Sequence, residues 1–274
     1  MLIAQITDPH IGFDPGPLAG QIDPSANLRR ALALVRQWEP KVEILLLTGD
    51  LVDSGRTRDY ELIAELLRAE LPPFPDSGPR VLTVPGNHDL RANMRAVLGH
   101  TMPVAHDAPP DRICLHLEQG GLHLIGLDTV VAGAPHGVLE RSQLDWLARQ
   151  LDACAGAPVM IFMHHPPLVS GMAAMDACGL LQGRAELGKL IAAHGRVQMI
   201  ACGHIHRPIT GSLGGAPIAV VPSVSHQLTL DLAPQAPVAV RLEPPMIGLF
   251  RFTPADGIIC HLSHVLPFGP SYPV

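Results

Sequence analysis

The sequence predicts a layered α/β fold, in which helices pack against buried β-sheets. Short apolar runs recur along the chain, each followed by a polar or glycine-containing cluster, as is typical of buried strands. Segments with apolar residues at helical spacing lie between these runs. This alternation continues over about two hundred residues, and it favours a domain built from stacked layers of helices and sheets.

The individual elements follow from the same patterns. The expected strands span residues 2–6, 42–47, 81–84, 122–127, 159–163 and 197–202. The expected helices span residues 27–38, 59–71, 92–98, 141–151 and 184–194. Ser25 and Ser142 stand near the starts of two of these helices, where serine side chains commonly cap free N–H groups. The proline-rich stretches 71–79 and 103–110 are expected to form surface loops.

The pattern changes after His206. Short alternating segments at 217–221, 226–232, 238–242, 247–252 and 258–265 are separated by proline and glycine, which is typical of antiparallel strands. We therefore expect a core unit of residues 1–210. Residues 211–274 would supply C-terminal strands that complete a second sheet, form a cap, or do both.

Composition excludes several classes of protein. The chain has 274 residues, of which 47% are hydrophobic and 16% charged, so collagen-like, coiled-coil and disordered structures are not expected. Its net charge of −6 gives no general attraction to nucleic acid or to an anionic membrane. An anionic substrate would need positive charge supplied locally.

The cysteines and the N-terminus indicate a reducing compartment. The 5 cysteines are widely spaced without a C-x-x-C pair, so neither a disulfide framework nor a sulfur-containing metal site is expected. Residues 1–8 lack a basic leader and are expected to form a strand rather than a signal peptide. No stretch approaches the roughly 18 apolar residues of a membrane span. A cytoplasmic protein is the expectation.

Potential metal ligands follow the strongest strand candidates. They occur in the motifs Asp8-Pro9-His10, Gly49-Asp50-Leu51-Val52-Asp53, Gly86-Asn87-His88-Asp89, His164-His165-Pro166-Pro167 and Gly203-His204-Ile205-His206. The carboxyl ends of strands are where α/β sheets place their sites. A single aspartate or histidine at a strand end is usually a cap or turn residue. Several such motifs in chain order make coincidence a poor account, and they predict one shared metal site.

Some members of these motifs keep two interpretations. Asp53 and Asp89 are either part of the metal site or residues that only orient their neighbours or cap helices. His165 is as consistent with supporting a ligand as with being one. Arg56, Arg91 and Arg207 follow the motifs and could contact substrate, although a solvated helix end is the simpler account of each.

The order D-x-H, G-D-x-x-D, G-N-H-D, H-x-P and G-H-x-H resembles the calcineurin-like metallophosphoesterase superfamily over residues 8–206. The G-N-H-D wording, the block 161–167 and Glu243-Pro244-Pro245 are similar to the class III cyclic nucleotide phosphodiesterases and their glycerophosphodiesterase relatives. Asp89 argues against the protein phosphatases of the superfamily, which typically have G-N-H-E. The resemblance implies a four-layer α/β/β/α sandwich with a small β-rich C-terminal cap or extension.

The resemblance also implies a binuclear metal centre. One divalent ion would be held by Asp8, His10, Asp50 and His206, and the other by Asp50, Asn87, His164 and His204. Asp50 would bridge the two ions, which could be Fe, Mn, Zn or Co because the ligands are oxygen and nitrogen atoms. His88 would be the catalytic residue and would also bind the phosphoryl group. His226 lies in a V-S-H-Q run similar to one in the glycerophosphodiesterases, and is a second candidate for binding substrate.

The implied activity is hydrolysis of small phosphodiesters by attack of a metal-bridging hydroxide. Cyclic nucleotides such as cAMP are the first candidates and glycerophosphodiesters the second. The alternatives are a phosphomonoesterase or nuclease with the same metals, or a metallophosphoesterase-like scaffold that binds partners without turnover. The acidic charge weakens the nuclease. Neither nucleic acid nor membrane is an expected partner, and a homo-oligomer is compatible with the sequence.

Overall fold

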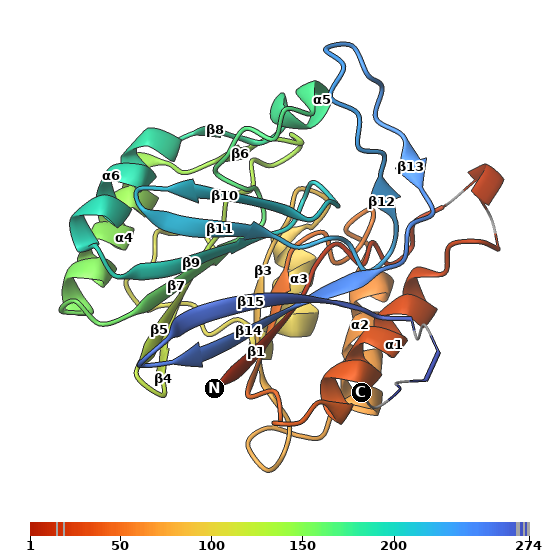
Figure 1. The fold of residues 1–274 in the computed structure, drawn as a ribbon, viewed down its shortest axis with the longest axis horizontal. Coiled ribbons are helices and arrows are strands. Elements are labelled where there is room, and N and C mark those ends of the chain that lie inside the picture. Colours follow the sequence, from red (N-terminus) through yellow and green to blue (C-terminus); the bar gives the residue numbers. More distant parts are fainter. Residues whose placement is uncertain (15, 19, 267–268, 271, 273–274) are drawn as a thin grey trace.

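Two β-sheets pack face to face, and helices cover their outer faces (Figure 1). The computed structural model describes residues 1–14, 16–18, 20–266, 269–270 and 272. One apolar core lies between the two sheets and under the helices of the first sheet, and a second lies between the second sheet and its own helices. The order of layers is helix, sheet, sheet, helix, which confirms the expected α/β/β/α sandwich.

The first sheet has the strand order β15-β14-β1-β2-β3. Its parallel strands are β1 (Leu2–Ile6), β2 (Ile44–Thr48) and β3 (Arg80–Val84). Strand β14 (Met246–Thr253) pairs antiparallel with β1, and β15 (Gly257–His264) pairs antiparallel with β14. Helices α1 (Pro24–Gln37), α2 (Thr57–Glu70) and α3 (Arg91–Leu98) contribute apolar residues to the core of this sheet. Because β1 and β2 are covered on both faces, every residue in them is buried.

The second sheet has the order β10-β11-β9-β7-β5-β4. These strands are β4 (Leu115–Gln119), β5 (Leu122–Leu127), β7 (Val159–Met163), β9 (Val197–Cys202), β10 (Ile209–Leu213) and β11 (Ala216–Val220). Alternate residues face the two cores: Phe162 packs toward the first sheet, and Ile161 toward α4 (Arg141–Ala153) and α6 (Arg184–His194).

Shorter elements connect and extend the two sheets. They are η1 (Gly16–Leu18), η2 (Gly99–Thr101), β6 (Gly137–Val138) paired with β8 (Leu180–Gln182), α5 (Ala173–Asp176), and β12 (Gln227–Leu228) paired with β13 (Val240–Arg241). The C-terminal strands are therefore shared: β11 lies in the second sheet, β14 and β15 extend the first, and β12 and β13 form a separate ribbon. The division of the chain at residue 210 stays a prediction.

The expected strands and helices are confirmed to within a few residues, but both expected helix caps are wrong. The sequence pattern did not predict β4 and β10, both at edges of the second sheet, or the short elements β6, β8 and α5. Asp23, not Ser25, accepts the N–H of Ala26 at the start of α1, and Glu140, not Ser142, forms the capping box of α4 with Gln143. Within the described residues, no helix combines the length and the apolar character that crossing a bilayer requires.

Candidate metal centre

The motif residues meet at one edge of the paired sheets. Strands β1, β2, β3, β7 and β9 are each separated by no more than one residue from the motif that follows, so the loops that follow them share this edge. The structure brings together all seven residues that the sequence analysis named as metal ligands. They fall into two groups that share Asp50.

The first group contains Asp8, His10, Asp50 and His206. The Nε2 atoms of His10 and His206 lie 3.2 Å apart. His206 Nε2 is 3.3 Å from Asp8 Oδ1, and His10 Nε2 is 3.7 Å from Asp50 Oδ2. All four side chains are buried.

The second group contains Asp50, Asn87, His164 and His204. His164 Nε2 lies 3.3 Å from Asp50 Oδ2 and 3.1 Å from Asn87 Oδ1. It also lies 3.2 Å from His204 Nδ1. Three oxygen or nitrogen atoms therefore surround the same nitrogen, an arrangement that suits a cation placed between them.

In each candidate ligand histidine, the ring nitrogen that faces away from the centre already makes a hydrogen bond. His206 Nδ1 donates to the carbonyl of His226, and His10 Nδ1 donates to the carboxylate of Asp53. On the other side of the centre, His164 Nδ1 donates to the carbonyl of Thr48 and His204 Nε2 donates to that of Cys178. Carbonyl and carboxylate oxygens only accept, so these contacts fix the tautomer of each neutral ring.

The inward-facing nitrogens consequently present lone pairs to each other. In neutral rings, the His10 and His206 Nε2 atoms face each other without a proton between them, and so do His164 Nε2 and His204 Nδ1. Two lone pairs at 3.2 Å repel unless a proton or a metal ion lies between them. A proton or a metal ion between the two nitrogens of each pair removes this repulsion, and their donor atoms are of the kind that bind divalent metal ions. Burial would lower the pKa of His164, but Asp50 and Asp8 outweigh it and raise that pKa to about 9, so a proton can occupy the second position when no metal ion is bound.

The backbone at the centre is held in an uncommon conformation. Asp8, His10, Asp50, His204 and His206 all have positive φ, between 46° and 72°. This region costs a residue other than glycine about 1–2 kcal/mol, and such strain clusters at functional sites. Gly203 shows how tightly the loops approach, because a Cβ atom there would collide with Thr7 and Asp8.

The electrostatics of the centre keep its carboxylates charged. Burial alone would raise the pKa of Asp8, but His206 and His164 outweigh it and lower that pKa to about 2. Burial likewise opposes ionisation of Asp50, whose pKa His164 and His10 nevertheless hold well below its usual value. Burial lowers the pKa of His10, and it lowers that of His204 to about 3, so these two rings are neutral at pH 7.

His88 lies at the rim of the centre, with its side chain 40% exposed. Its ring Nδ1 donates to the backbone carbonyl of Asp53 at 2.7 Å, and its backbone N–H donates to Asp50 Oδ1 at 2.8 Å. Burial would lower the pKa of His88, but the Asp50 carboxylate and the Asp53 carbonyl outweigh it and raise that pKa. The ring meets that of His10 edge-on, with centroids 4.8 Å apart.

His226 lies beside the first group. Its ring stacks on Phe13 with centroids 4.5 Å apart, and it lies 4.8 Å from the ring of His206. Burial, together with His206 and His10, lowers the pKa of His226 to about 3. His226 is predicted from the sequence as a candidate, but the local pattern does not indicate its contact with Phe13.

The contacts of His165, Asp53 and Asp89, which each have two interpretations from the sequence, are with neighbouring protein groups. His165 accepts from the Thr129 hydroxyl at Nδ1 and donates from Nε2 to the Pro135 carbonyl, so neither nitrogen is available to a metal. Asp53 orients His10. Asp89 accepts the backbone N–H groups of Leu51 and Gly86, and so joins the loops after β2 and β3.

The three arginines are all paired within the chain. Arg56 binds Asp59, Arg91 binds Asp128 and Arg207 binds Glu243.

Several residues at the centre were not found from the sequence. Thr7 donates to Asp8 Oδ2 at 2.6 Å, and Ser223 donates to the Asp8 carbonyl at 2.7 Å. The Cys178 carbonyl anchors His204 from a segment well outside the motifs. Of these, only Thr7 adjoins a motif, so sequence proximity could have pointed to it alone.

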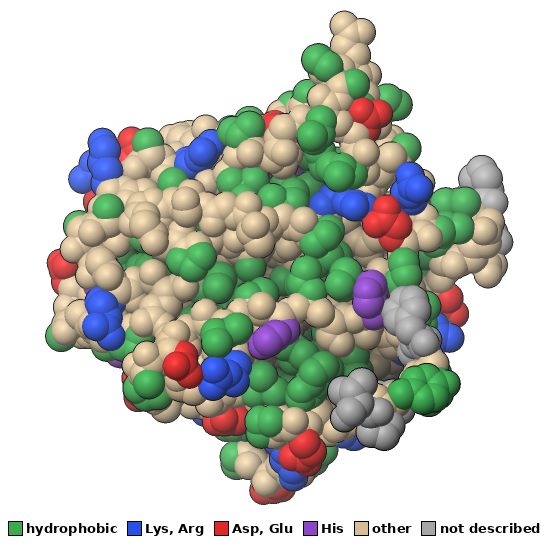
Figure 2. All heavy atoms as spheres, in the orientation of Figure 1, with side chains coloured by type: hydrophobic (Ala, Val, Ile, Leu, Met, Phe, Trp, Pro, Cys, Tyr) green, Lys and Arg blue, Asp and Glu red, His purple; other side chains and the backbone are tan. Residues whose placement is uncertain are grey.

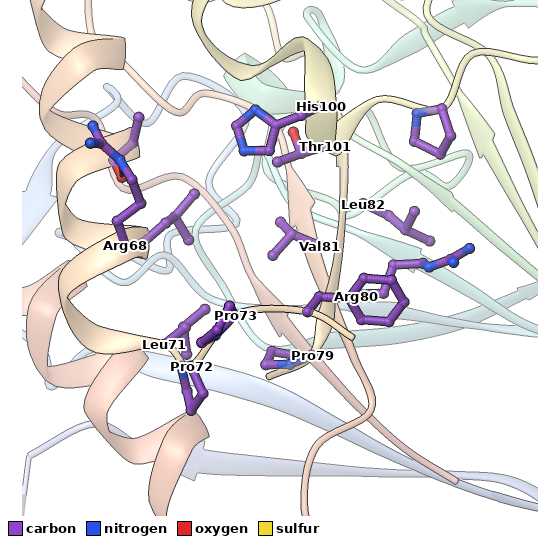
Figure 3. A pocket seen from close by; sticks show the side chains of 14 residues that line it. Arg68, Leu71, Pro72, Pro73, Pro79, Arg80, Val81, Leu82, His100 and Thr101 are labelled. Atoms are coloured by element: carbon purple, nitrogen blue, oxygen red, sulfur yellow. Dashed lines mark hydrogen bonds between the residues drawn. The ribbon is translucent and has the colours of Figure 1, made fainter. Parts of the chain in front are cut away.

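Two cavities differ in their relation to the centre. A cavity of about 400 Å³ adjoins His226 and is also lined by Asn27, Arg30, Arg241 and Glu243. Another, of about 720 Å³, lies between the end of α2 and β3, where Arg68, Arg80 and His100 edge a largely apolar wall (Figure 3). None of the residues that line this second cavity belongs to the metal centre.

Comparison with known proteins decides the family. A family model described as calcineurin-like phosphoesterase matches residues 1–208, which include all the motifs. The chain belongs to the calcineurin-like phosphoesterase family. Among curated proteins, this phosphoesterase is 30% identical to a probable glycerophosphodiester phosphodiesterase of Arcobacter nitrofigilis, over 100% of this chain and 96% of that protein. It is also 32% identical to a cAMP/cGMP dual specificity phosphodiesterase of Mycobacterium tuberculosis, over 85% of this chain and 70% of that one.

Solved structures show the same fold at low sequence identity. A dimetal phosphatase from Danio rerio superposes with a TM-score of 0.69 at 15% identity, covering 97% of this phosphoesterase and 96% of that chain. A purple acid phosphatase from yellow lupin gives a TM-score of 0.64 at 14% identity, covering 97% of this chain and 51% of that one.

Proposed function

We propose that this chain is a dinuclear metal-dependent phosphodiesterase that hydrolyses small phosphodiesters. The observation that supports it most strongly is the pair of close nitrogen contacts, His10 with His206 and His164 with His204, because one metal ion between the two nitrogens of each pair would accept both lone pairs. The two ions would be held by the residues of the first and second groups, with Asp50 shared: Asp8, His10, Asp50 and His206 for one, and Asp50, Asn87, His164 and His204 for the other.

The ligand chemistry suits divalent ions of intermediate hardness. The set contains imidazole nitrogens, carboxylates and one amide oxygen, which are compatible with Fe, Mn, Zn or Co. When bound, two such ions lower the pKa of water from 15.7 to about 7 and bring positive charge to a phosphate that this acidic chain otherwise does not supply. The protein's part is to fix each ring through Asp53, Thr48 and the carbonyls of Cys178 and His226.

His88 is the proposed catalytic residue. The bond from Nδ1 to the Asp53 carbonyl fixes its tautomer and directs the other ring nitrogen away from that carbonyl. A ring held in this way at the rim, partly exposed and beside Asp50, can donate to a phosphoryl oxygen or protonate the leaving alkoxide. The backbone N–H of His88 also donates to Asp50, so the same residue would hold a metal ligand and contact the substrate.

His226 and the adjoining cavity are proposed to bind the rest of the substrate. The cavity of about 400 Å³ has room for a small organic group, and Arg30 and Arg241 offer polar contacts to it. The printed names of the relatives refer to glycerophosphodiesters and to cyclic nucleotides, so both belong to the proposed substrate class. On the face in Figure 2, cationic and anionic side chains are interspersed rather than gathered into a basic strip, which favours a small substrate over nucleic acid.

A turnover comparison tests this proposal. The full chain, loaded with Mn²⁺, is assayed in parallel on cAMP, glycerophosphocholine, a phosphomonoester and a chromogenic diester. We expect hydrolysis of the diesters to exceed that of the monoester, and Asp50→Asn to abolish it. His100→Ala is the matched control, because this exposed histidine lines the separate cavity next to β3. Preference for the monoester would favour a phosphatase, and no turnover despite bound metal would favour the binding scaffold.

A further inference from the structure

A second cluster of ligand-type side chains lies on the helix-covered face of the second sheet. It consists of His116 on β4, His123 on β5 and Cys154 at the C-cap of α4. Their ligand atoms all lie within 4.8 Å of one another. Leu115 and Leu122, next to the two histidines, face the first sheet, so both imidazoles face the helices.

The distances in this cluster match a metal site. His116 Nε2 lies 3.0 Å from His123 Nδ1 and 3.8 Å from Cys154 Sγ. A tetrahedral ion with Zn–N of about 2.0–2.1 Å and Zn–S of about 2.3 Å separates its ligands by roughly 3.3 Å for two nitrogens and roughly 3.6 Å for nitrogen and sulfur. The two distances from His116 Nε2 are within a few tenths of an ångström of these values.

Gln150 fixes the tautomer of His116 through the ring nitrogen that does not face the cluster. Gln150 Nε2 donates to Asp107 Oδ2 at 3.0 Å, which leaves Gln150 Oε1 as the acceptor for His116 Nδ1 at 2.7 Å. His116 Nε2 therefore carries the lone pair of the neutral ring and faces both His123 and Cys154. Without a metal ion, the single lone pair of His116 Nε2 faces both the His123 ring N–H and the Cys154 thiol, and it can accept fully from only one of them. A metal ion would instead accept a lone pair from each of the three atoms.

We propose that His116, His123 and Cys154 form a third metal site, for a thiolate-preferring divalent ion such as Zn²⁺. Three protein ligands leave a fourth position for water. Binding would release the Cys154 thiol proton to solvent and leave the His123 proton on Nε2. The ion would fasten the end of α4 to β4 and β5, and β4 is an edge strand of the second sheet.

The cysteine ligand allows this site to be distinguished by spectroscopy from the phosphoesterase centre. The ligands proposed for that centre contain no sulfur, so a sulfur-to-cobalt charge-transfer band can come only from a cysteine site. The experiment is a Co²⁺ titration of the reduced, metal-free full chain, followed by near-ultraviolet absorption. We expect a band whose final intensity corresponds to one thiolate-bound Co²⁺ per chain, both in the wild type and in Asp50→Asn, which alters the other centre only.

Variants assign the band to the cluster. Cys154→Ser should abolish it, and Gln150→Ala should weaken Co²⁺ binding by about 10–100-fold through loss of the orienting bond to His116. Cys260→Ser, at a partly buried cysteine on β15, is the matched control and should keep the band. If Cys154→Ser fails to fold, His123→Gln provides the same test. Absence of the band from the wild type, or its persistence in Cys154→Ser, would overturn the proposal.

Discussion

Replacing His88 by alanine should separate catalysis from structure. The side chain is 40% exposed, and its ring makes one hydrogen bond, to the Asp53 carbonyl. Losing this bond should lower the free energy of unfolding by about 0.5–1.5 kcal/mol. The backbone N–H that holds Asp50 remains in the variant, so both metal ions should still bind. Removing a positioned acid–base group should reduce turnover by about 10²–10⁴-fold.

At 1.36 kcal/mol for each factor of ten, that loss corresponds to roughly 2.7–5.4 kcal/mol of transition-state stabilisation, which exceeds the expected change in stability. The assay is kcat/KM of metal-loaded His88→Ala on a p-nitrophenyl diester and on cAMP, with metal content measured on the same sample. The defect should be smaller for the p-nitrophenyl diester, because that leaving group needs no proton. Metal content that collapses together with activity would refute the reasoning and make His88 a structural residue.

Further substitutions address other parts of the molecule. Asn87→Ala should weaken the second of two metal-binding events in calorimetry, because the second group has only Asp50 as a full anionic ligand; unchanged affinities would contradict the ligand assignment. Arg91→Ala should cost about 3 kcal/mol in urea unfolding, because it leaves the buried Asp128 carboxylate without its bidentate partner, whereas Arg141→Ala, at a fully exposed ion pair, should leave the urea midpoint unchanged. Replacing residues 171–175 with Gly and Ser should change the ratio of cAMP to glycerophosphocholine turnover and leave metal content intact; an unchanged ratio would place selectivity elsewhere.

Most of the strands and helices can be predicted from the sequence, because the spacing of apolar residues along a short segment indicates its secondary structure. The predicted strands 122–127, 159–163 and 197–202 have their observed bounds, since each is a short and largely apolar run. Strand β10 was missed because it contains Thr, Gly and Ser at a sheet edge, where apolar residues are not required. The cap of α1 was misplaced because Asp23 and Ser25 are both good caps, and only the backbone geometry separates them.

The candidate ligands were accessible from the sequence because each stands at the end of a strand. The contacts that orient them were not, since the carbonyls of Cys178 and His226 act through backbone atoms that any residue could supply. The cluster of His116, His123 and Cys154 is a similar case. Its members are separated by 38 residues between His116 and Cys154, and no short spacing motif marks them.

Anomalous scattering from a Mn²⁺-soaked crystal tests the central claim most directly. The account requires a cation between His10 Nε2 and His206 Nε2, and another between His164 Nε2 and His204 Nδ1, with Asp50 within reach of both. It predicts two anomalous peaks at these positions, and loss of both in Asp50→Asn. A map with a peak at only one of these two pairs of nitrogens, or at neither, would contradict a binuclear centre built from these residues.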